Sequence, residues 1–156
     1  MATTPADVRI TRATIGDLDD LVPLFDGYRQ FYGRRSDLAG ARGFLGERMA
    51  REESVIYVAY TGPREAAGFT QLYPSFSSVS LKPLWILNDL FVRPDTRRGG
   101  LGRALLERAR QHAVDTGAKG LVLSTGVTNK AAQTLYESCG WQRDDNFFEY
   151  HLFFEP

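Results

Sequence analysis

The sequence has a single cysteine, Cys139, and no apolar run approaching the roughly 20 residues that a membrane-spanning helix needs. One cysteine excludes a disulfide within the chain and favours a reducing compartment. Residues 1–7 also lack the basic segment followed by an apolar run that marks a secretory signal. We therefore expect a cytoplasmic protein that does not bind membranes.

An excess of charge of either sign is also absent. The 156 residues include 19 Lys and Arg against 19 Asp and Glu, a formal net charge of zero. This balance argues against a nucleic-acid-binding protein, which needs a basic surface to neutralise phosphates. The two histidines, His112 and His151, stand far apart, without the cysteine or carboxylate spacing of a metal site. We expect no nucleic-acid partner and no metal.

Repeats, low-complexity tracts and linkers are missing as well, so we expect one domain over residues 1–156 with a sizeable core. Apolar and β-branched patterns predict strands at 8–11, 54–61, 67–73, 84–92, 121–124 and 147–153. Apolar residues at helical spacing predict helices at 18 to about 32, 38–51, 100–115 and 129–139. This order, β-α-α-β-β-β-α-β-α-β, indicates an α/β (α+β) protein whose mixed sheet is flanked by about four helices.

The most informative segment is the glycine-rich turn Arg97-Arg98-Gly99-Gly100-Leu101-Gly102-Arg103, between a predicted strand and a predicted helix. Gly100 and Gly102 have no Cβ, so a ligand can approach the backbone closely. The first turn of a helix has unpaired N–H groups and carries the positive end of the helix dipole. The three arginines add positive charge. The turn therefore predicts a site for a ligand that carries phosphates.

Two common phosphate loops do not fit this turn. A P-loop ends in Gly-Lys-Ser/Thr, whereas the chain has Gly102-Arg103-Ala104. A dinucleotide fingerprint needs a third glycine where Leu105 stands, and it usually follows the first strand. The pattern Arg/Gln-x-x-Gly-x-Gly/Ala does fit, over Arg97–Gly102. The alternative is a glycine-rich helix start that binds nothing.

A second segment, Asn129–Trp141, has the pattern of one short capped helix. Asn129 can cap the helix, and Gly140 stands where a left-handed residue ends one. Ala132, Leu135, Tyr136 and Cys139 follow helical spacing between these two ends.

Together, in this order, the two segments resemble the GCN5-related N-acetyltransferase (GNAT) family, with the polyamine and histone-type branch as the most similar. The resemblance extends from about Val8 to Phe154. It implies the GNAT acyl-CoA N-acyltransferase fold, in which strands splay apart before the two motif helices. It also implies transfer of an acetyl group from the cosubstrate acetyl-CoA to a primary amine, by direct attack in a ternary complex.

The same resemblance implies how acetyl-CoA is bound. Its pyrophosphate would lie on the glycine-rich turn and its pantetheine would pair with the central strand, as in strand augmentation. Asn129 would bond the pantetheine from the other side. The implied cofactor-binding residues are Leu90, Phe91, Val92, Arg97, Arg98, Gly99, Gly100, Leu101, Gly102, Arg103, Asn129 and Ala132.

Two residues are expected to move protons. Tyr136 stands at the family's tyrosine position, where the hydroxyl protonates the departing thiolate; the alternative is a packed core tyrosine. Asn88 stands where the polyamine branch has a glutamate, and an amide cannot act as a base. Asp89 is the only carboxylate of that strand. It either accepts the amine proton through a water or bonds the arginine-rich turn structurally.

For the acceptor amine, the resemblance points to the connection between the first two helices. Phe31 and Tyr32 lie there and can contact a cation, while Tyr73 and Asn88 stand near the same groove. A polyamine-like small molecule, an amino-acid derivative and a protein amino group all remain open. A silent acyl-CoA-binding module and a nucleotide-binding module are the rival functions.

The C-terminal segment Phe147–Phe154 is rich in aromatic residues and apolar on both faces. That is more apolar surface than one domain of this size needs to bury, so we expect a homodimer that uses this region.

Overall fold

A computed structural model describes residues 8–97 and 99–155, in two compact units that divide after Ser124. The first unit contains β1 (Arg9–Arg12), η1 (Ile15–Asp17), α1 (Leu18–Phe31), α2 (Leu38–Ala50), β2 (Val55–Tyr60), β3 (Ala66–Ser77), β4 (Lys82–Val92), η2 (Pro94–Thr96), α3 (Leu101–Asp115) and β5 (Leu121–Val122). The second unit contains α4 (Lys130–Ser138). The predicted α/β class and the order of elements up to α4 are confirmed.

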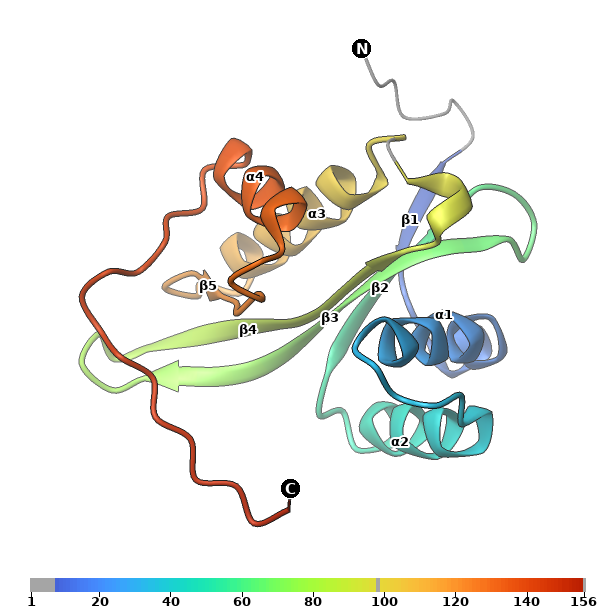
Figure 1. Cartoon of the computed structure of the whole chain (residues 1–156), viewed down its shortest axis with the longest axis horizontal. Helices are drawn as coiled ribbons and strands as arrows, with labels where there is room; N and C mark the ends of the chain where they lie inside the picture. Colours follow the sequence, from blue (N-terminus) through green and yellow to red (C-terminus); the bar gives the residue numbers. More distant parts are fainter. Residues whose placement is uncertain (1–7, 98, 156) are drawn as a thin grey trace. The chain divides into compact units, whose positions relative to one another are not determined.

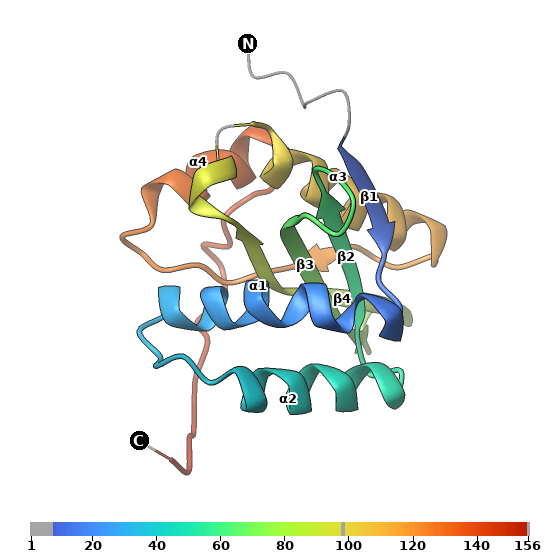
Figure 2. The same ribbon diagram turned by 90° about the vertical axis from the view of Figure 1, so that its right-hand side faces the viewer.

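The first unit is a five-stranded sheet in the order β1-β2-β3-β4-β5. The first four strands are antiparallel and β5 runs parallel to β4, so the sheet is mixed, as predicted. Helices α1 and α2 cover one face and α3 covers the other (Figure 1). Figure 2 shows α1 and α2 side by side across the strands.

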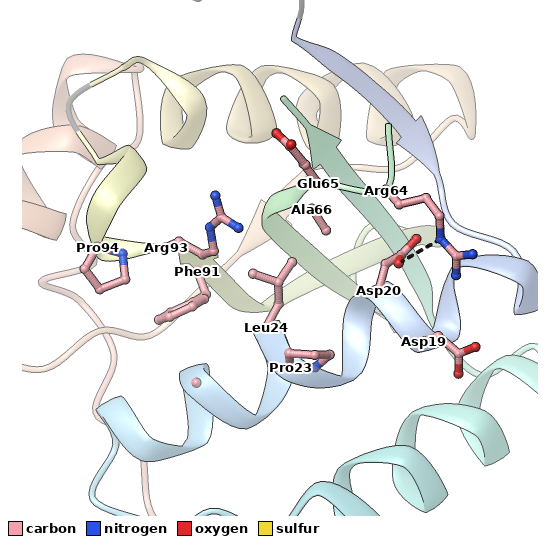
Figure 3. A pocket seen from close by; sticks show the side chains of 11 residues that line it. Asp19, Asp20, Pro23, Leu24, Arg64, Glu65, Ala66, Phe91, Arg93 and Pro94 are labelled. Carbon is pink, nitrogen blue, oxygen red and sulfur yellow. Dashed lines mark ion pairs between the residues drawn. The ribbon is translucent and has the colours of Figure 1, made fainter. Parts of the chain in front are cut away.

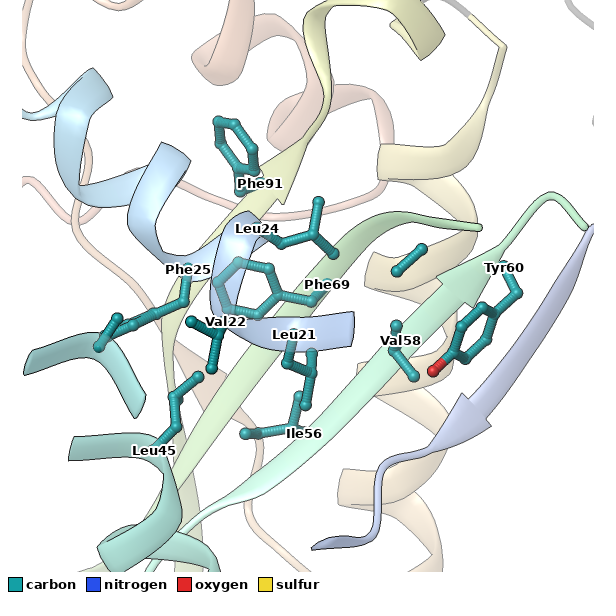
Figure 4. Packing of buried hydrophobic residues seen from close by; sticks show 12 residues of the cluster. Leu21, Val22, Leu24, Phe25, Leu45, Ile56, Val58, Tyr60, Phe69 and Phe91 are labelled. Atoms are coloured by element: carbon teal, nitrogen blue, oxygen red, sulfur yellow. The ribbon is translucent and has the colours of Figure 1, made fainter. Parts of the chain in front are cut away.

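The core lies between α1, α2 and the sheet. β2 is buried at all six positions, and its β-branched and aromatic residues suit a strand covered on both faces. The helix α1 turns one apolar face towards it, and Asp17 closes a capping box with Thr14 at the preceding helical turn. Figure 4 shows this packing, which includes Leu21, Leu24, Phe25, Leu45, Ile56 and Phe69.

Two irregularities in β4 prepare the site. Gln71 of β3 faces Asp89 while Leu72 faces Leu87, so Asn88 is an extra residue in a β-bulge. β4 pairs with β5 only at Trp85 and Ile86. Beyond Ile86, the edge of β4 that faces away from β3 has no strand partner in the part of the first unit that the structure describes. This is the splay that the family resemblance implies.

The predicted strand at 147–153 is wrong: no strand is present there among the described residues. Its large apolar side chains, from Phe147 to Phe154, are exposed. The physical reason is that a strand forms only where a neighbouring strand satisfies its N–H and C=O groups, and the described residues provide none for this segment.

Candidate active site

The glycine-rich turn connects the end of β4 to α3, as predicted. Gly100 is the N-cap of α3 and has a φ of 80°, a left-handed conformation that favours glycine. Helical hydrogen bonding begins when the Ala104 N–H donates to the Gly100 carbonyl, 3.0 Å away. The N–H groups of Leu101, Gly102 and Arg103 precede it in the first turn, where a helix binds anions. Arg98 lies outside the described residues.

The Arg97 side chain points back towards the end of β4 and does not follow the glycine-rich turn. Its Nε donates to the carbonyl of Val92, 3.0 Å away. Its guanidinium carbon lies 5.9 Å from the centre of the Phe31 ring and 5.6 Å from that of Phe91. The side chain that we expected beside the phosphates thus connects the turn to the end of α1.

The segment Leu90–Val92, predicted to bind pantetheine, occupies the splayed part of β4. On one side its residues pair with Gly68–Thr70 of β3, and the other edge is the unpaired one. Phe91 is buried, whereas Leu90 and Val92 are half-buried. A strand-like ligand with amide groups can therefore pair with this edge.

Asp89 is a buried acid with two amide donors. It is 1% exposed, and its carboxylate accepts bonds from Gln71 Nε2 at 2.5 Å and Asn88 Nδ2 at 2.7 Å. Burial raises its pKa, and these bonds oppose the increase. Among the described residues the hydrogen-bond partners of Asp89 are these two amides, while Arg98 of the arginine-rich turn lies outside them.

Tyr28 is a site residue that the sequence analysis missed. Its hydroxyl donates to the carbonyl of Asn88, 3.2 Å away, which places it beside the neighbouring residue Asp89. Burial and the nearby Asp89 charge raise its pKa above the usual tyrosine value. Burial and Asp89 raise the pKa of Tyr73 in the same way. Its position in α1 alone indicates only a packing role, and the docking of α1 on the bulge places the hydroxyl here.

Three of the four predicted acceptor residues, Phe31, Tyr32 and Asn88, come together around this helix end. Phe31 and Tyr32 are 57% and 56% exposed, with ring centres 5.3 Å apart. The Tyr32 ring centre is 5.0 Å from that of Tyr28, whose hydroxyl bonds Asn88. Exposed aromatic surface thus lies next to the bulge.

Asp26 fixes the chain that follows this aromatic surface. It is 4% exposed and accepts bonds from Gln30 Nε2, Ser36 Oγ and the Asp37 N–H at 2.7–2.8 Å. The Asp37 N–H is the main cause that lowers the Asp26 pKa. The connection between α1 and α2 is therefore held by a buried carboxylate.

Asn129, Ala132 and Tyr136 belong to the second unit. The Asn129 side chain accepts a bond from the Ala132 N–H at 3.2 Å, so the predicted cap is confirmed. Gly140 has a φ of 91°, and the Trp141 N–H donates to the Tyr136 carbonyl at 3.1 Å. The predicted end of α4 is confirmed too.

A hollow of about 440 Å³ lies at the other end of α1, between Asp20, Arg64, Glu65 and Arg93 (Figure 3). Asp20 bonds the Tyr60 hydroxyl at 2.9 Å and pairs with Arg64 at 3.7 Å. Most of the charged side chains around the hollow are therefore paired within the protein. Of the predicted site residues that the structure describes, Phe91 alone lines the hollow. Among the described residues there is no metal-binding cluster, and none of their helices is long and apolar enough to cross a membrane.

Comparison with known proteins decides the family. The model of the Acetyltransferase (GNAT) family matches residues 21–141. This chain belongs to the GNAT family. That match extends across the boundary between the two units. As a GNAT protein it is an acyltransferase enzyme, and the family generally uses acetyl-CoA as its cosubstrate.

Similar GNAT proteins support this assignment. YhfO of Bacillus subtilis (strain 168), an uncharacterized N-acetyltransferase, is 47% identical over 145 residues, which cover 93% of this chain and 97% of YhfO. A probable acetyltransferase of Haemophilus influenzae is 31% identical over 115 residues, 74% of this chain and 79% of that protein. The crystal structure of a probable acetyltransferase has a TM-score of 0.90 and 46% identity, covering 95% of this chain and 99% of that one.

Proposed function

We propose that this protein transfers an acetyl group from acetyl-CoA to a primary amine by direct attack in a ternary complex, in the cytoplasm. The observation that carries the proposal is the splayed β4, which has an open edge at Leu90–Val92 and a bulge at Asn88. The left-handed Gly100 starts α3 directly after it.

The residues of this region fit acetyl-CoA. The N–H groups of Leu101–Arg103 would hold the pyrophosphate, and Leu90–Val92 would pair with the pantetheine amides. A backbone N–H near Leu90 would stabilise the oxyanion, a contribution of about 3–4 kcal/mol in other acyl-transfer enzymes. When bound, the cosubstrate supplies an activated acetyl carbonyl. The amine nitrogen bonds to that carbonyl carbon and the carbon–sulfur bond breaks.

In this proposal Asp89 is the final acceptor of the amine proton. A primary amine has a pKa of about 10.4, so it arrives protonated and must lose a proton before it attacks. Because Asp89 is buried, the proton reaches it through the Tyr28 hydroxyl or a water. A raised pKa makes Asp89 a stronger base than an exposed carboxylate.

Tyr136 is proposed as the donor to the departing thiolate. Reference pKa values are about 10 for tyrosine and about 8.5 for a thiol, so complete transfer is uphill by roughly 2 kcal/mol. A hydrogen bond that strengthens as the carbon–sulfur bond breaks is therefore the form that we propose.

Charge favours an amino-acid derivative over a polyamine as the acceptor. Arg34 and Arg35 are exposed in the α1–α2 connection and make no ion pair with the described residues. Asp26, the buried acid of α1 that holds this connection, is already bonded by three donors. The two arginines outnumber Asp37 in this connection, so a polycation would meet a net positive charge, whereas an amine that also carries a carboxylate would be attracted.

Tyrosine and tyramine test this preference because they differ only in the carboxylate. We expect tyrosine to have the higher kcat/KM in an assay of thiol release from acetyl-CoA. The double variant Arg34→Ala/Arg35→Ala should reduce that advantage about tenfold and leave tyramine unchanged. The control is Arg110→Ala, an exposed arginine of α3. Equal rates for both amines in the wild type would contradict the preference.

A silent acyl-CoA-binding module is the second candidate, and one observation favours it. Asn88 replaces a glutamate, and both Asp89 oxygens already accept amide bonds. A panel of amines in the thiol-release assay, with acetyl-CoA binding measured by calorimetry, separates the two. Binding without any release would support the silent module. Competition by ATP or NAD at an affinity similar to that of acetyl-CoA would instead indicate a nucleotide-binding module.

A further inference from the structure

The connection between α1 and α2, residues 32–37, borders the region where acetyl transfer is proposed. At its start the Phe31 ring centre lies 5.9 Å from the guanidinium carbon of Arg97, in the glycine-rich turn. The Tyr32 ring centre lies 5.0 Å from that of Tyr28, whose hydroxyl bonds a carbonyl of the bulge in β4. Figure 2 shows how the connection joins the neighbouring ends of α1 and α2. An acceptor amine at the bulge would therefore lie beside this connection.

The first half of the connection is fixed by the way α1 ends. Gly33 has a φ of 84°, and its N–H donates to the Gln30 carbonyl, 2.9 Å away. The Arg34 N–H donates to the Arg29 carbonyl, 3.0 Å away. A left-handed glycine with these two bonds is the Schellman motif, which ends a helix in one defined conformation. The local sequence therefore determines the backbone as far as Arg34.

The second half of the connection is fixed by Asp26, a buried acid of α1. Its Oδ1 accepts a bond from the Asp37 N–H at 2.8 Å, and its Oδ2 accepts bonds from Ser36 Oγ at 2.7 Å and Gln30 Nε2 at 2.8 Å. Because Asp26 is 4% exposed, water competes little for these bonds. Asp37 in turn caps α2, since its carboxylate accepts a bond from the Gly40 N–H at 2.9 Å. One carboxylate of α1 thus sets where α2 begins.

Arg34 and Arg35 lie between these two fixed parts of the chain, and both are exposed. The bond from the Asp37 N–H lowers the pKa of Asp26, so the carboxylate stays ionised at neutral pH and keeps its three bonds. The two arginines are therefore carried by a segment that is held at both ends. A segment that is already ordered binds a ligand without the entropy loss of ordering a flexible loop.

We propose that Asp26 is a positioning residue for the acceptor amine. Through its bonds to Ser36 and Asp37 it holds the connection in the conformation that binds the acceptor. Arg34 and Arg35 are then placed to attract a carboxylate of that amine. This inference rests on the proposed function, because it takes the connection to be part of the acceptor site. It predicts that loosening the connection weakens acceptor binding and leaves the acetyl-transfer step intact.

Steady-state kinetics of the full chain, with tyrosine as the acceptor, test this role. Ser36→Ala removes one of the three bonds at an exposed position. We expect the KM for tyrosine to rise about three- to tenfold, while kcat stays within about twofold and acetyl-CoA affinity is unchanged. Ser36→Thr keeps the hydroxyl and should restore the KM. The matched control is Ser77→Ala, which removes a hydroxyl that accepts a bond from the Ser80 N–H at the end of β3.

Asp26→Asn tests the carboxylate itself. An asparagine has the same size and can still accept the bond from the Asp37 N–H, but its NH₂ group cannot accept the bonds from Ser36 and Gln30. The KM for tyrosine should therefore rise at least as much as in Ser36→Ala. A lower kcat with an unchanged KM in both variants would indicate a merely structural role and overturn the proposal. If circular dichroism shows Asp26→Asn unfolded, Ser36→Ala decides alone.

Limited digestion with trypsin gives a readout that does not need turnover. Trypsin cuts after exposed arginines where the chain is loosely held, so the bonds after Arg34 and Arg35 report how firmly the connection is fixed. We expect both bonds to be cut at least about threefold faster in Ser36→Ala than in the wild type or in Ser77→Ala. Saturating tyrosine, added with coenzyme A, should slow the cutting of the wild type.

The outcomes of the digestion separate this inference from the proposed function. Unchanged cutting in Ser36→Ala would show that these bonds do not hold the connection and would overturn the proposal. A wild type that tyrosine does not protect would overturn the acceptor role, even where acetyl transfer occurs. Protection by tyrosine in a wild type that releases no thiol would contradict acetyl transfer and support the positioning role.

Discussion

The guanidinium of Arg97 lies over the ring of Phe31, 5.9 Å from its centre. Because Arg97 Nε also bonds the Val92 carbonyl, this side chain connects three elements: the end of β4, the glycine-rich turn and the last turn of α1. Phe31 is an expected acceptor residue, and the turn is the expected pyrophosphate site. The two binding regions therefore share one arginine.

Replacing Arg97 should distinguish a connecting residue from a phosphate ligand. Arg97→Lys keeps the charge but loses the Nε bond. It should therefore raise the KM for the acceptor amine as strongly as Arg97→Ala does, by about two- to fivefold. Acetyl-CoA affinity and its salt dependence should change little in either variant. Rescue by lysine, together with a weaker salt dependence in the alanine variant, would instead identify a phosphate contact.

Gly100 and Gly102 should separate folding from binding. Gly100 has a φ of 80°, so Gly100→Ala should lower stability by about 1–2 kcal/mol. Gly102 lies inside the first turn of α3, where Gly102→Val places a branched side chain at the expected phosphate. Thermal unfolding with and without coenzyme A measures both effects. We expect Gly102→Val to stay folded and to lose the ligand-induced increase in Tm. A normal increase would contradict the assignment of this turn.

Asp89 and Tyr28 should act together on the rate. Asp89→Asn and Tyr28→Phe each remove one member of the proposed relay, so kcat should fall by about 10²-fold while acetyl-CoA affinity is retained. The control is Thr116→Ser, a conservative change that is remote from the relay. A wild-type kcat in both variants, with chemistry rate-limiting, would exclude the relay.

The raised pKa of Asp89 also fixes the sign of its effect on stability. A carboxyl with a raised pKa binds its proton more tightly in the folded state, so its contribution to the free energy of unfolding falls as the pH rises above the unfolded value of 3.8. The free energy of unfolding of Asp89→Asn should therefore lie below that of the wild type by a smaller amount at neutral pH than at acid pH. Urea unfolding at both pH values measures this difference.

The sequence predicted best what depends on neighbouring residues. The Asn129 cap and the left-handed Gly140 each involve groups a few residues apart, and both are present. The contact between Tyr28 and Asn88 joins residues 60 positions apart, and no local pattern encodes it. It follows from how α1 docks on the bulge.

The C-terminal segment shows the limit of periodicity in another way. Its aromatic and apolar residues predicted a strand, but a strand also needs a neighbour that satisfies its backbone groups, and composition does not say what supplies it. The direction of Arg97 was missed for a similar reason. A phosphate motif specifies the backbone of the turn, whereas the side chain follows the aromatic rings that tertiary packing places beside it.

The final prediction concerns Tyr136. Tyr136→Phe removes only the hydroxyl and keeps the ring, which packs 6.0 Å from the Trp141 ring. Acetyl-CoA affinity should therefore stay within a few-fold of the wild type, while kcat falls by about 10²-fold. A rate lost with binding kept identifies an interaction made mainly in the transition state. Trp141→Phe is the matched control, because it alters the same packing without touching the hydroxyl. If Tyr136→Phe kept the wild-type rate on a good amine, with chemistry rate-limiting, a water would have to protonate the thiolate and Tyr136 would serve only to shape the binding site.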